Sequence, residues 1–243
     1  MTEQLWYLKQ CGLFQRLTPQ ELAPLESQCR TRQFARGAPI YLPADQANGV
    51  LLLTTGRAKI CSFTEEGKQA ILAFIDPGEL FGELALFGGG EREEYAEAVE
   101  KSTVILMPGD AVNQLVHRHA GLALGVTKLI GLRRKRIERR LKYLLFRSNR
   151  ERLISLLLEL ADQYGKPAED GLRLGIKLSH QDLASIIGST RETVTVILGE
   201  LQDEGLLTIG RRRITLISRE RLAKASRPPQ PAPAPRQEQT TAG

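Results

Sequence analysis

The spacing of apolar residues predicts two kinds of structure along the chain. Between residues 32 and 107 the apolar residues form short runs, as in "GVLLLTTGRAKICSF", "KQAILAFIDPGE" and "STVILMPGD". "TEEGKQ" and "DPGE" are turn signals between such runs. Many short strands at close spacing predict a small antiparallel barrel or roll. Residues 1 to 30 predict short helices, one of which begins at Pro19 after an N-cap at Thr18.

A long helical stretch follows, from Asp110 to about Phe146. In its second half, positions three and four residues apart form one stripe: Val126, Ile130, Arg133, Ile137, Leu141 and Leu144. A small barrel cannot cover a helix of this length. A seam with a second copy of the chain would bury the stripe, so the pattern predicts a homodimer.

The C-terminal third predicts a small group of helices and strands. "RERLISLLLELADQYG" has an amphipathic helical pattern that ends at Gly165, and residues 166–172 predict a polar loop. Two short helices are expected at 181–187 and 191–204, followed by strands in "LLTIG" and "RITLI". The end of the chain holds five of the twelve prolines and predicts a flexible tail.

Composition is that of a globular protein, with 42% hydrophobic and 26% charged residues among 243. No apolar run approaches the roughly 20 residues that span a bilayer, and "MTEQLWYL" lacks the pattern of a secretory signal. We therefore expect a cytoplasmic protein without a membrane partner. The three cysteines include no CxxC pair, which argues against a disulfide framework, a zinc site and an iron–sulfur cluster.

The positive charge is concentrated in one segment. The net charge is +6, yet residues 128–152 alone hold eleven basic and two acidic residues. Such a concentration suggests an anionic partner more strongly than the total does.

A pair of short helices near residue 188 has the pattern of a helix-turn-helix. Ser179 and Ser189 each precede a helix and are followed three residues later by a carboxylate, Asp182 and Glu192, as N-caps often are. A tight turn that contains Gly188 joins the two helices. In the second helix the apolar stripe consists of Val194, Ile197, Leu198 and Leu201.

The opposite face of that second helix carries groups that suit the major groove of DNA. The guanidinium of Arg191 can donate two hydrogen bonds to guanine, and the carboxylate of Glu192 can accept one from cytosine. Ser189, Thr190 and the helix-start N–H groups would hold phosphates, and a basic hairpin at residues 211–213 would contact the backbone as a wing. The alternative is a solvated helix start, which we disfavour because cap, turn, polar face and hairpin occur together. The full predicted set is Ser179, His180, Ser189, Thr190, Arg191, Glu192, Thr193, Thr195, Arg211, Arg212 and Arg213.

"KLSHQDLASIIGSTRETVTVILGELQDEGLL" and "DPGELFGELALFGGGERE" resemble the DNA-binding module and the effector loop of the cyclic-AMP receptor protein/FNR (Crp/Fnr) superfamily. The similarity spans about residues 8 to 220, and its C-terminal half is most similar to the cyanobacterial global nitrogen regulator. It implies an α+β fold: a cyclic-nucleotide-binding-like β-barrel (double-stranded β-helix), a dimerisation helix and a winged helix-turn-helix. Relatives commonly carry arginine where this chain has Val196, which implies a changed or relaxed base at one position of the half-site.

The resemblance also assigns the parts of the chain. Residues 1–109 would be an effector-sensing barrel with N-terminal helices, 110–146 the dimerisation helix, 147–226 the DNA-binding domain, and 227–243 a disordered proline-rich tail. The segment "DQYGKPAEDG" corresponds to a surface that contacts RNA polymerase. The chain is thus expected to be a homodimeric regulator of transcription, an activator that can also repress, bound to a pseudo-palindromic duplex.

The effector is expected at the barrel loop and the long helix. Gly88, Gly89 and Gly90 would let backbone N–H groups approach an anion. By resemblance, the effector-binding residues are Phe81, Gly82, Glu83, Leu84, Arg92, Arg133, Ile137 and Glu138. Arg133 lies on the apolar stripe, where it needs an anionic partner unless it reaches around the seam to water.

Two effectors remain open, with effector-independent regulation a further alternative. Gly82, Glu83, Leu84 and Arg92 match positions that bind cyclic nucleotides, but Glu93 stands where a small hydroxyl residue is usual. Arg133 and Glu138 match the positions that hold 2-oxoglutarate in the nitrogen regulator, but Glu94 stands where its barrel arginine is expected.

Other classes of function fit the sequence less well. The three histidines lack metal-ligand spacing, nothing resembles the ligands of heme-binding relatives, and no segment remains for a catalytic domain. A signalling module that binds a ligand and a protein partner, instead of DNA, stays as an alternative.

Overall fold

The computed structural model describes residues 2–87, 90–210 and 213–225, and the chain divides into two compact units, Met1–Leu141 and Lys142–Gly243. Arg211, Arg212, Gly88, Gly89 and the proposed tail from residue 227 lie outside the described residues. The domain boundaries given above stay a prediction.

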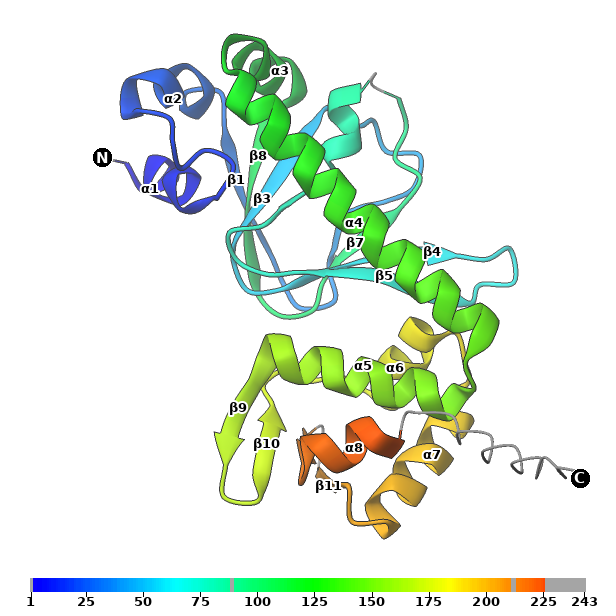
Figure 1. Ribbon diagram of the computed structural model, residues 1–243. Helices are drawn as coiled ribbons and strands as arrows, with labels where there is room; N and C mark the ends of the chain where they lie inside the picture. Colours follow the sequence, from blue (N-terminus) through cyan, green and yellow to red (C-terminus); the bar gives the residue numbers. More distant parts are fainter. Residues whose placement is uncertain (1, 88–89, 211–212, 226–243) are drawn as a thin grey trace, which may run out of the picture. The chain divides into compact units, whose positions relative to one another are not determined.

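The first unit contains the expected barrel, built from two four-stranded antiparallel sheets (Figure 1). Their orders are β1-β8-β3-β6 and β2-β7-β4-β5. The strands are β1 (Arg30–Phe34), β2 (Pro39–Tyr41), β3 (Gly49–Thr55), β4 (Ala58–Phe63), β5 (Gln69–Ile75), β6 (Leu80–Phe81), β7 (Tyr95–Ala98) and β8 (Ser102–Pro108). A 3-10 helix, η1 (Glu83–Phe87), follows β6. The three quoted apolar runs form β3 with β4, β5 and β8, so the predicted barrel is confirmed.

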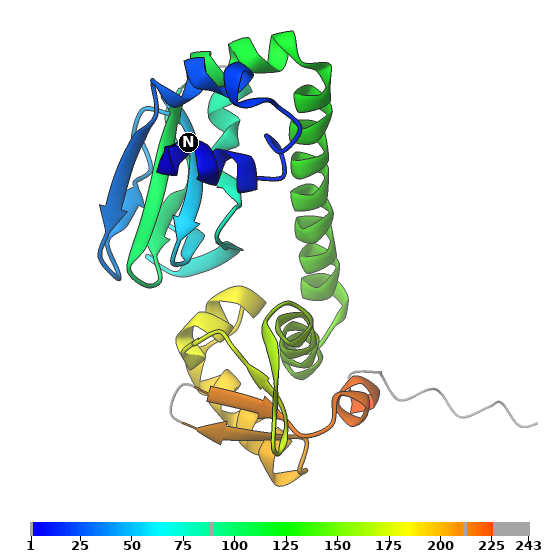
Figure 2. The ribbon, with the colours of Figure 1, turned by 90° about the vertical axis from the view of Figure 1, so that its left-hand side faces the viewer.

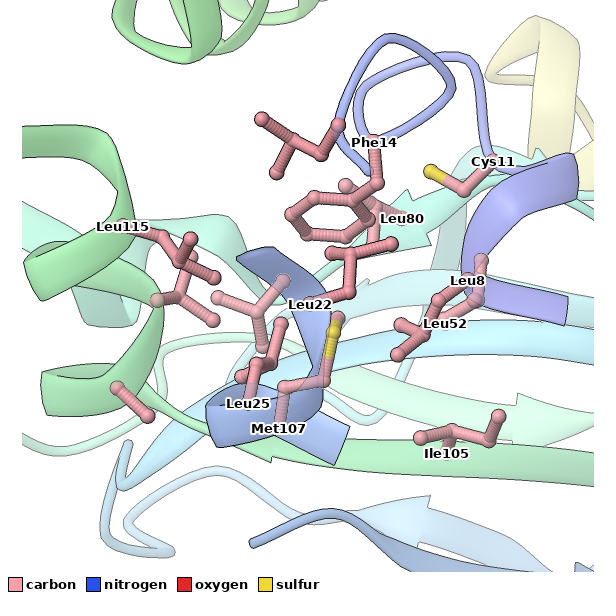
Figure 3. Close-up of a cluster of buried hydrophobic side chains, with 14 of the residues drawn as sticks. Leu8, Cys11, Phe14, Leu22, Leu25, Leu52, Leu80, Ile105, Met107 and Leu115 are labelled. Carbon is pink, nitrogen blue, oxygen red and sulfur yellow. The ribbon is translucent and has the colours of Figure 1, made fainter. Parts of the chain in front are cut away.

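Strand β3 is apolar on both faces because each face joins a different core. Leu51 and Leu53 pack between the two sheets, with Tyr41 and Phe81. Val50 and Leu52 point to the other side, where α1 (Glu3–Gln10), α2 (Pro19–Glu26) and α3 (Gly109–Arg118) cover the sheet. Figure 3 shows the side chains of this second core converging from the helices and from β3 and β8. A strand buried on both faces reads as a continuous apolar run, as "VLLL" does.

The predicted single helix from Asp110 to Phe146 is two helices, α3 and α4 (Ala120–Phe146). His119 separates them with an extended backbone, and its N–H donates to the carbonyl of Leu115 as a cap. The axes of α3 and α4 point in different directions (Figures 1 and 2). The apolar spacing continues across the break, since both Leu115 and Leu122 join the core beneath α3, so periodicity alone does not reveal it.

The second unit contains two helices, a hairpin, the helix-turn-helix and a second hairpin. The elements are α5 (Asn149–Tyr164), β9 (Gly165–Ala168), β10 (Gly171–Leu174), α6 (His180–Ile187), α7 (Arg191–Asp203), β11 (Leu207–Gly210), β12 (Arg213–Leu216) and α8 (Arg219–Ala225). The four strands form one antiparallel sheet in the order β11-β12-β10-β9, and Figure 2 shows β11 and β12 in orange.

The polar loop predicted at residues 166–172 is wrong, because this segment forms the β9–β10 hairpin. Its turn ends at Gly171, whose φ of 131° is unfavourable for other residues. Strand β10 also pairs with β12, with Leu172 opposite Leu216. That partner lies more than forty residues away, so a local pattern could not reveal the strand. Helix α8 was not predicted either.

The helix-turn-helix has one predicted cap and one shifted cap. The Ser179 hydroxyl accepts from the Asp182 N–H at 3.1 Å, and the Asp182 carboxylate accepts from the Ser179 N–H at 2.9 Å, as expected. The second cap is Thr190, not Ser189, and its hydroxyl accepts from the Thr193 N–H at 3.2 Å. The N–H of Ser189 donates to the carbonyl of Ala184 and so closes the preceding helix.

The two glycines of this region should respond oppositely to alanine. Gly188 has φ 65°, and a Cβ there would lie 2.9 Å from Leu144 Cδ2, so Gly188→Ala should destabilise the second unit by about 1–2 kcal/mol. Gly199 lies inside α7 with open space around its Cβ position, so Gly199→Ala should stabilise it by roughly 0.5–1 kcal/mol. Urea unfolding followed by circular dichroism measures both. A Gly188→Ala midpoint at or above that of the unmodified chain would contradict the left-handed turn.

Candidate functional site

The N-terminal half of α7 presents a polar surface because its other face is buried. Val194, Ile197, Leu198 and Leu201 are buried, and α5 and α6 pack against this helix. The remaining side chains therefore point outward: Arg191, Glu192 and Thr195 are exposed and Thr193 is half-buried. This is the arrangement that the sequence predicted for a recognition helix.

Several hydroxyl groups among the predicted DNA contacts already have partners. The hydroxyls of Ser179 and Thr190 accept the capping bonds, and Thr190 Oγ1 also lies 3.0 Å from Thr193 Oγ1. Thr195 Oγ1 donates to the Arg191 carbonyl at 2.8 Å and lies 2.8 Å from His180 Nδ1. His180, at the start of α6, therefore links the two helices beside the recognition face. His180 and Thr195 are fifteen residues apart in the sequence, so the periodicity of either helix does not predict this contact.

The basic hairpin is described only in part. Arg213 is exposed and begins β12, opposite Gly210 of β11. Arg211 and Arg212 stand between these strands in the sequence and lie outside the described residues.

A further residue, missed by the sequence interpretation, holds the turn between α6 and α7. Arg152 Nη1 donates to the carbonyl of Ile187 at 2.7 Å and to that of Gly188 at 3.5 Å. Its Nη2 donates to Asn149 Oδ1, while Nε is buried with no partner in the described structure. A cation at the C-terminal end of α6 is stabilising, because the last carbonyl groups of a helix have no hydrogen-bond partner within it and carry partial negative charge. The only sequence signal was its place in a basic segment.

A cavity of about 300 Å³ opens in the first unit between the barrel and α4. Much of its wall is aliphatic, contributed by strands and by α4, with Gly82, Glu83 and Leu84 at one side. Arg133 enters it from α4 and pairs with the carboxylate of Glu83 and the carbonyl of Leu80. Glu83 is 6% exposed and therefore requires a cation nearby. Because its guanidinium is held by Glu83 and Leu80, Arg133 does not reach around the seam to water, which was the alternative.

The predicted effector residues do not all meet at this cavity. Arg92 lines a second cavity of about 300 Å³ together with Tyr41. Its Nη2 donates to the Gly49 carbonyl at 2.8 Å, and its guanidinium lies 4.2 Å from the centre of the Tyr41 ring. A Cβ at position 82 would lie 2.5 Å from Arg92 Nη1, so glycine permits this close approach.

The other predicted effector residues are dispersed. Phe81 is fully buried in the barrel core. Leu84 and Ile137 line the first cavity but are 60% and 58% exposed. Glu138 is exposed, pairs with Arg134 at 2.7 Å, one turn earlier on α4, and does not belong to the lining of the first cavity.

Glu94 adds a second carboxylate to the first cavity. Burial raises its pKa, and the nearby charge of Glu83 raises it further. Its Oε2 lies 3.5 Å from the Tyr41 hydroxyl. Burial also raises the pKa of Tyr41, and the Glu94 charge adds to this shift. Three carboxylates, Glu79, Glu83 and Glu94, and three arginines, Arg133, Arg134 and Arg136, line this cavity, so its formal charges carry no excess of positive charge.

An exposed polar recognition helix, held in a helix-turn-helix beside a hairpin, defines a DNA-binding regulator, and the barrel has the fold of a cyclic-nucleotide-binding domain. The pattern of the Crp-like helix-turn-helix domain matches residues 151–225, and that of the cyclic nucleotide-binding domain matches residues 31–119. The chain belongs to the Crp/Fnr family of transcription regulators.

Relatives along most of the chain support this assignment. The global nitrogen regulator of Synechocystis sp. is 33% identical over 207 residues, 84% of this chain and 90% of the relative. The cyclic AMP receptor protein of Thermus thermophilus is 30% identical over 203 residues, 84% of this chain and 91% of that protein.

Solved structures agree on the fold. A CRP/FNR-family transcriptional regulator from Thermus thermophilus superposes with a TM-score of 0.65 at 29% identity, covering 81% of this chain and 98% of the other. A CooA mutant from Carboxydothermus hydrogenoformans gives a TM-score of 0.72 at 23% identity, covering 83% and 89%. Within the described ranges, no helix is long and apolar enough to cross a membrane.

The pairing of Arg133 with Glu83 should dominate the stability of the first unit near this cavity. Arg133→Met leaves a buried carboxylate without its cation and should lower the free energy of unfolding by about 2–4 kcal/mol. Adding Glu83→Gln should restore most of that loss, because the remaining amide is neutral. Urea unfolding monitored by the fluorescence of Trp6, in the same unit, measures the cycle. Additive losses in the double variant would show that the two side chains do not interact.

Proposed function

We propose that this chain is a homodimeric, sequence-specific regulator of transcription, with a small anionic effector bound between its barrel and α4. The observation that carries the DNA-reading part is the outward face of α7. Arg191 and Glu192 stand exposed at its N-terminal end, above a buried apolar face that fixes the orientation of the helix. The guanidinium would read guanine and the carboxylate cytosine in the major groove.

The exposed part of the α4 stripe supports the dimer. Val126, at the start of the stripe, is buried against its own unit, whereas Ile137 is 58% and Leu141 55% exposed. Leu132 on the same helix is 62% exposed. Apolar side chains spaced along one helix in this way are what a seam with a second α4 would bury. Two recognition helices about 34 Å apart would then reach successive major grooves of a pseudo-palindromic duplex.

The effector is proposed to act by competing with Glu83 for Arg133. An anion such as 2-oxoglutarate, or the phosphate of a cyclic nucleotide, would bind the guanidinium and displace the Glu83 carboxylate. The displaced side chain would disturb the link between η1 and α4. Such a ligand shifts the dimer only to the extent that it prefers one arrangement over the other.

Effector-independent regulation is a second candidate, and the Arg133–Glu83 pair favours it. Arg133, the arginine that would hold an external anion, already pairs with the carboxylate of Glu83. In that case the connection between the barrel and α4 is permanent.

Activation would use the β9–β10 hairpin. Its turn residues, Glu169 and Asp170, precede Gly171 within the segment whose resemblance implies a contact with RNA polymerase. Repression would follow where the operator overlaps a promoter.

Base reading is tested by Arg191→Ala in a gel-shift assay. On a duplex selected from a random pool, the variant should lose about 1–3 kcal/mol per half-site and should no longer prefer the base pair that Arg191 reads. Arg173→Ala, which removes an exposed arginine on β10, serves as the matched control and should keep the selected sequence. Binding by the unmodified chain should fall steeply with salt. If the unmodified chain and both variants bind the selected duplex and an unrelated duplex with equal affinity, base reading is excluded.

Effector binding is tested by calorimetric titration with 2-oxoglutarate and with cyclic AMP. Glu83→Gln should tighten anion binding, because it frees Arg133 from its internal carboxylate, and Arg133→Met with Glu83→Gln should abolish it. Arg139→Met removes an exposed arginine of the same helix as the control. If neither ligand binds to the unmodified chain or to Glu83→Gln, the effector-independent candidate is favoured.

A further inference from the structure

One aliphatic side chain on the recognition face of α7 is largely exposed. Val196 is 60% exposed in the middle of this helix. It lies one turn after Glu192 and next to Thr195, both of which are exposed. The face that would enter the major groove therefore carries an apolar group beside its charged and polar ones.

The surroundings of Val196 leave its methyl groups accessible. The next residue on this face is Gly199, where an added Cβ would meet no atom within 4 Å. Glu200, one turn beyond Val196, is directed to Arg150 at 3.2 Å. Among the described residues of the following turn, neither Gly199 nor Glu200 therefore places a side chain over Val196.

The fold itself gives no reason for valine at this position. Valine is a weaker helix former than alanine, leucine or arginine, and here it gains little from burial. What it offers is a rigid surface: its branched Cβ has one strongly preferred rotamer in a helix, so two methyl groups are held in place before any partner arrives.

Only one base presents a matching group in the major groove. The C5-methyl of thymine is the sole apolar substituent among the four base pairs there, while the other edges are hydrogen-bond donors and acceptors that lose water without compensation against valine. We propose that Val196 is a specificity-determining residue that reads thymine, through its C5-methyl, at the position next to the bases contacted by Arg191 and Glu192. This inference rests on the proposed base reading by α7.

Deoxyuridine provides a test at the level of one methyl group, because it keeps the hydrogen-bonding edge of thymine and lacks only that group. The best duplex selected by the unmodified full chain is resynthesised with deoxyuridine at one thymine position at a time, symmetrically in both half-sites. One position should lose affinity by about fourfold per half-site and about 15-fold for the duplex, as expected for removing one buried methyl from each site. In Val196→Ala that penalty should disappear at this position alone.

A second variant and a control sharpen the assignment. Val196→Arg should select a different base, guanine, at the same position that was sensitive to deoxyuridine in the unmodified chain. Ile217→Val, which trims another exposed aliphatic side chain of the same unit, should leave the deoxyuridine profile unchanged. Val196→Ala should unfold at the same temperature or slightly higher, because alanine is the better helix former.

The outcomes separate this inference from the proposed function. A deoxyuridine penalty that persists in Val196→Ala would assign the methyl contact to another side chain, such as Thr195, and overturn the proposal. A selected site with no methyl-sensitive thymine would also overturn it, while leaving base reading by Arg191 intact. Failure to select any sequence, with Arg191→Ala equal to the unmodified chain, would overturn both.

Discussion

The burial of one face of α7 is the constraint from which the nucleic-acid interface follows. Val194, Leu198 and Leu201 are inaccessible to solvent, so the helix cannot rotate about its axis without exposing them. Rotation is also limited at the N-terminal end, where Thr190 caps α7 and Arg152 holds the carbonyls of the preceding turn. Arg191, Glu192, Thr195 and Val196 consequently point outward as a set. The specificity of such a helix depends on the order of these side chains and not on their flexibility.

In the first unit, the buried carboxylate of Glu83 and the guanidinium of Arg133 neutralise each other. Glu83 and Arg133 come from η1 and α4, so their pairing joins the barrel to the helix that leads to the second unit. Arg92, which the sequence placed in the same site, is held by Gly49 and Tyr41 at another cavity. An anion that pairs with Arg133 in the α4 cavity would therefore have to replace the carboxylate of Glu83.

Much of the fold followed from local patterns, and the exceptions have physical causes. The apolar runs of β3, β5 and β8 and the stripe of α7 were readable because each face of the element has a consistent environment. The short strands β2 and β6 pair with β7 and β3, which are distant in sequence, so their own residues carry little signal. The break between α3 and α4 at His119 could not be predicted, because the helical spacing of apolar residues continues across it from Leu115 to Leu122. For the recognition helix, residue types at known helical positions were sufficient to expect an exposed face, whereas the effector loop required the side-chain positions of Arg92 and Arg133, which spacing does not determine.

Strand pairing in the second unit has a mechanical consequence. Because β12 hydrogen-bonds to both β11 and β10, the wing and the hairpin that ends at Gly171 belong to a single four-stranded sheet. The pairs Leu172–Leu216 and Arg173–Thr215 connect the backbones of the two hairpins, so a displacement of one hairpin is passed directly to the other.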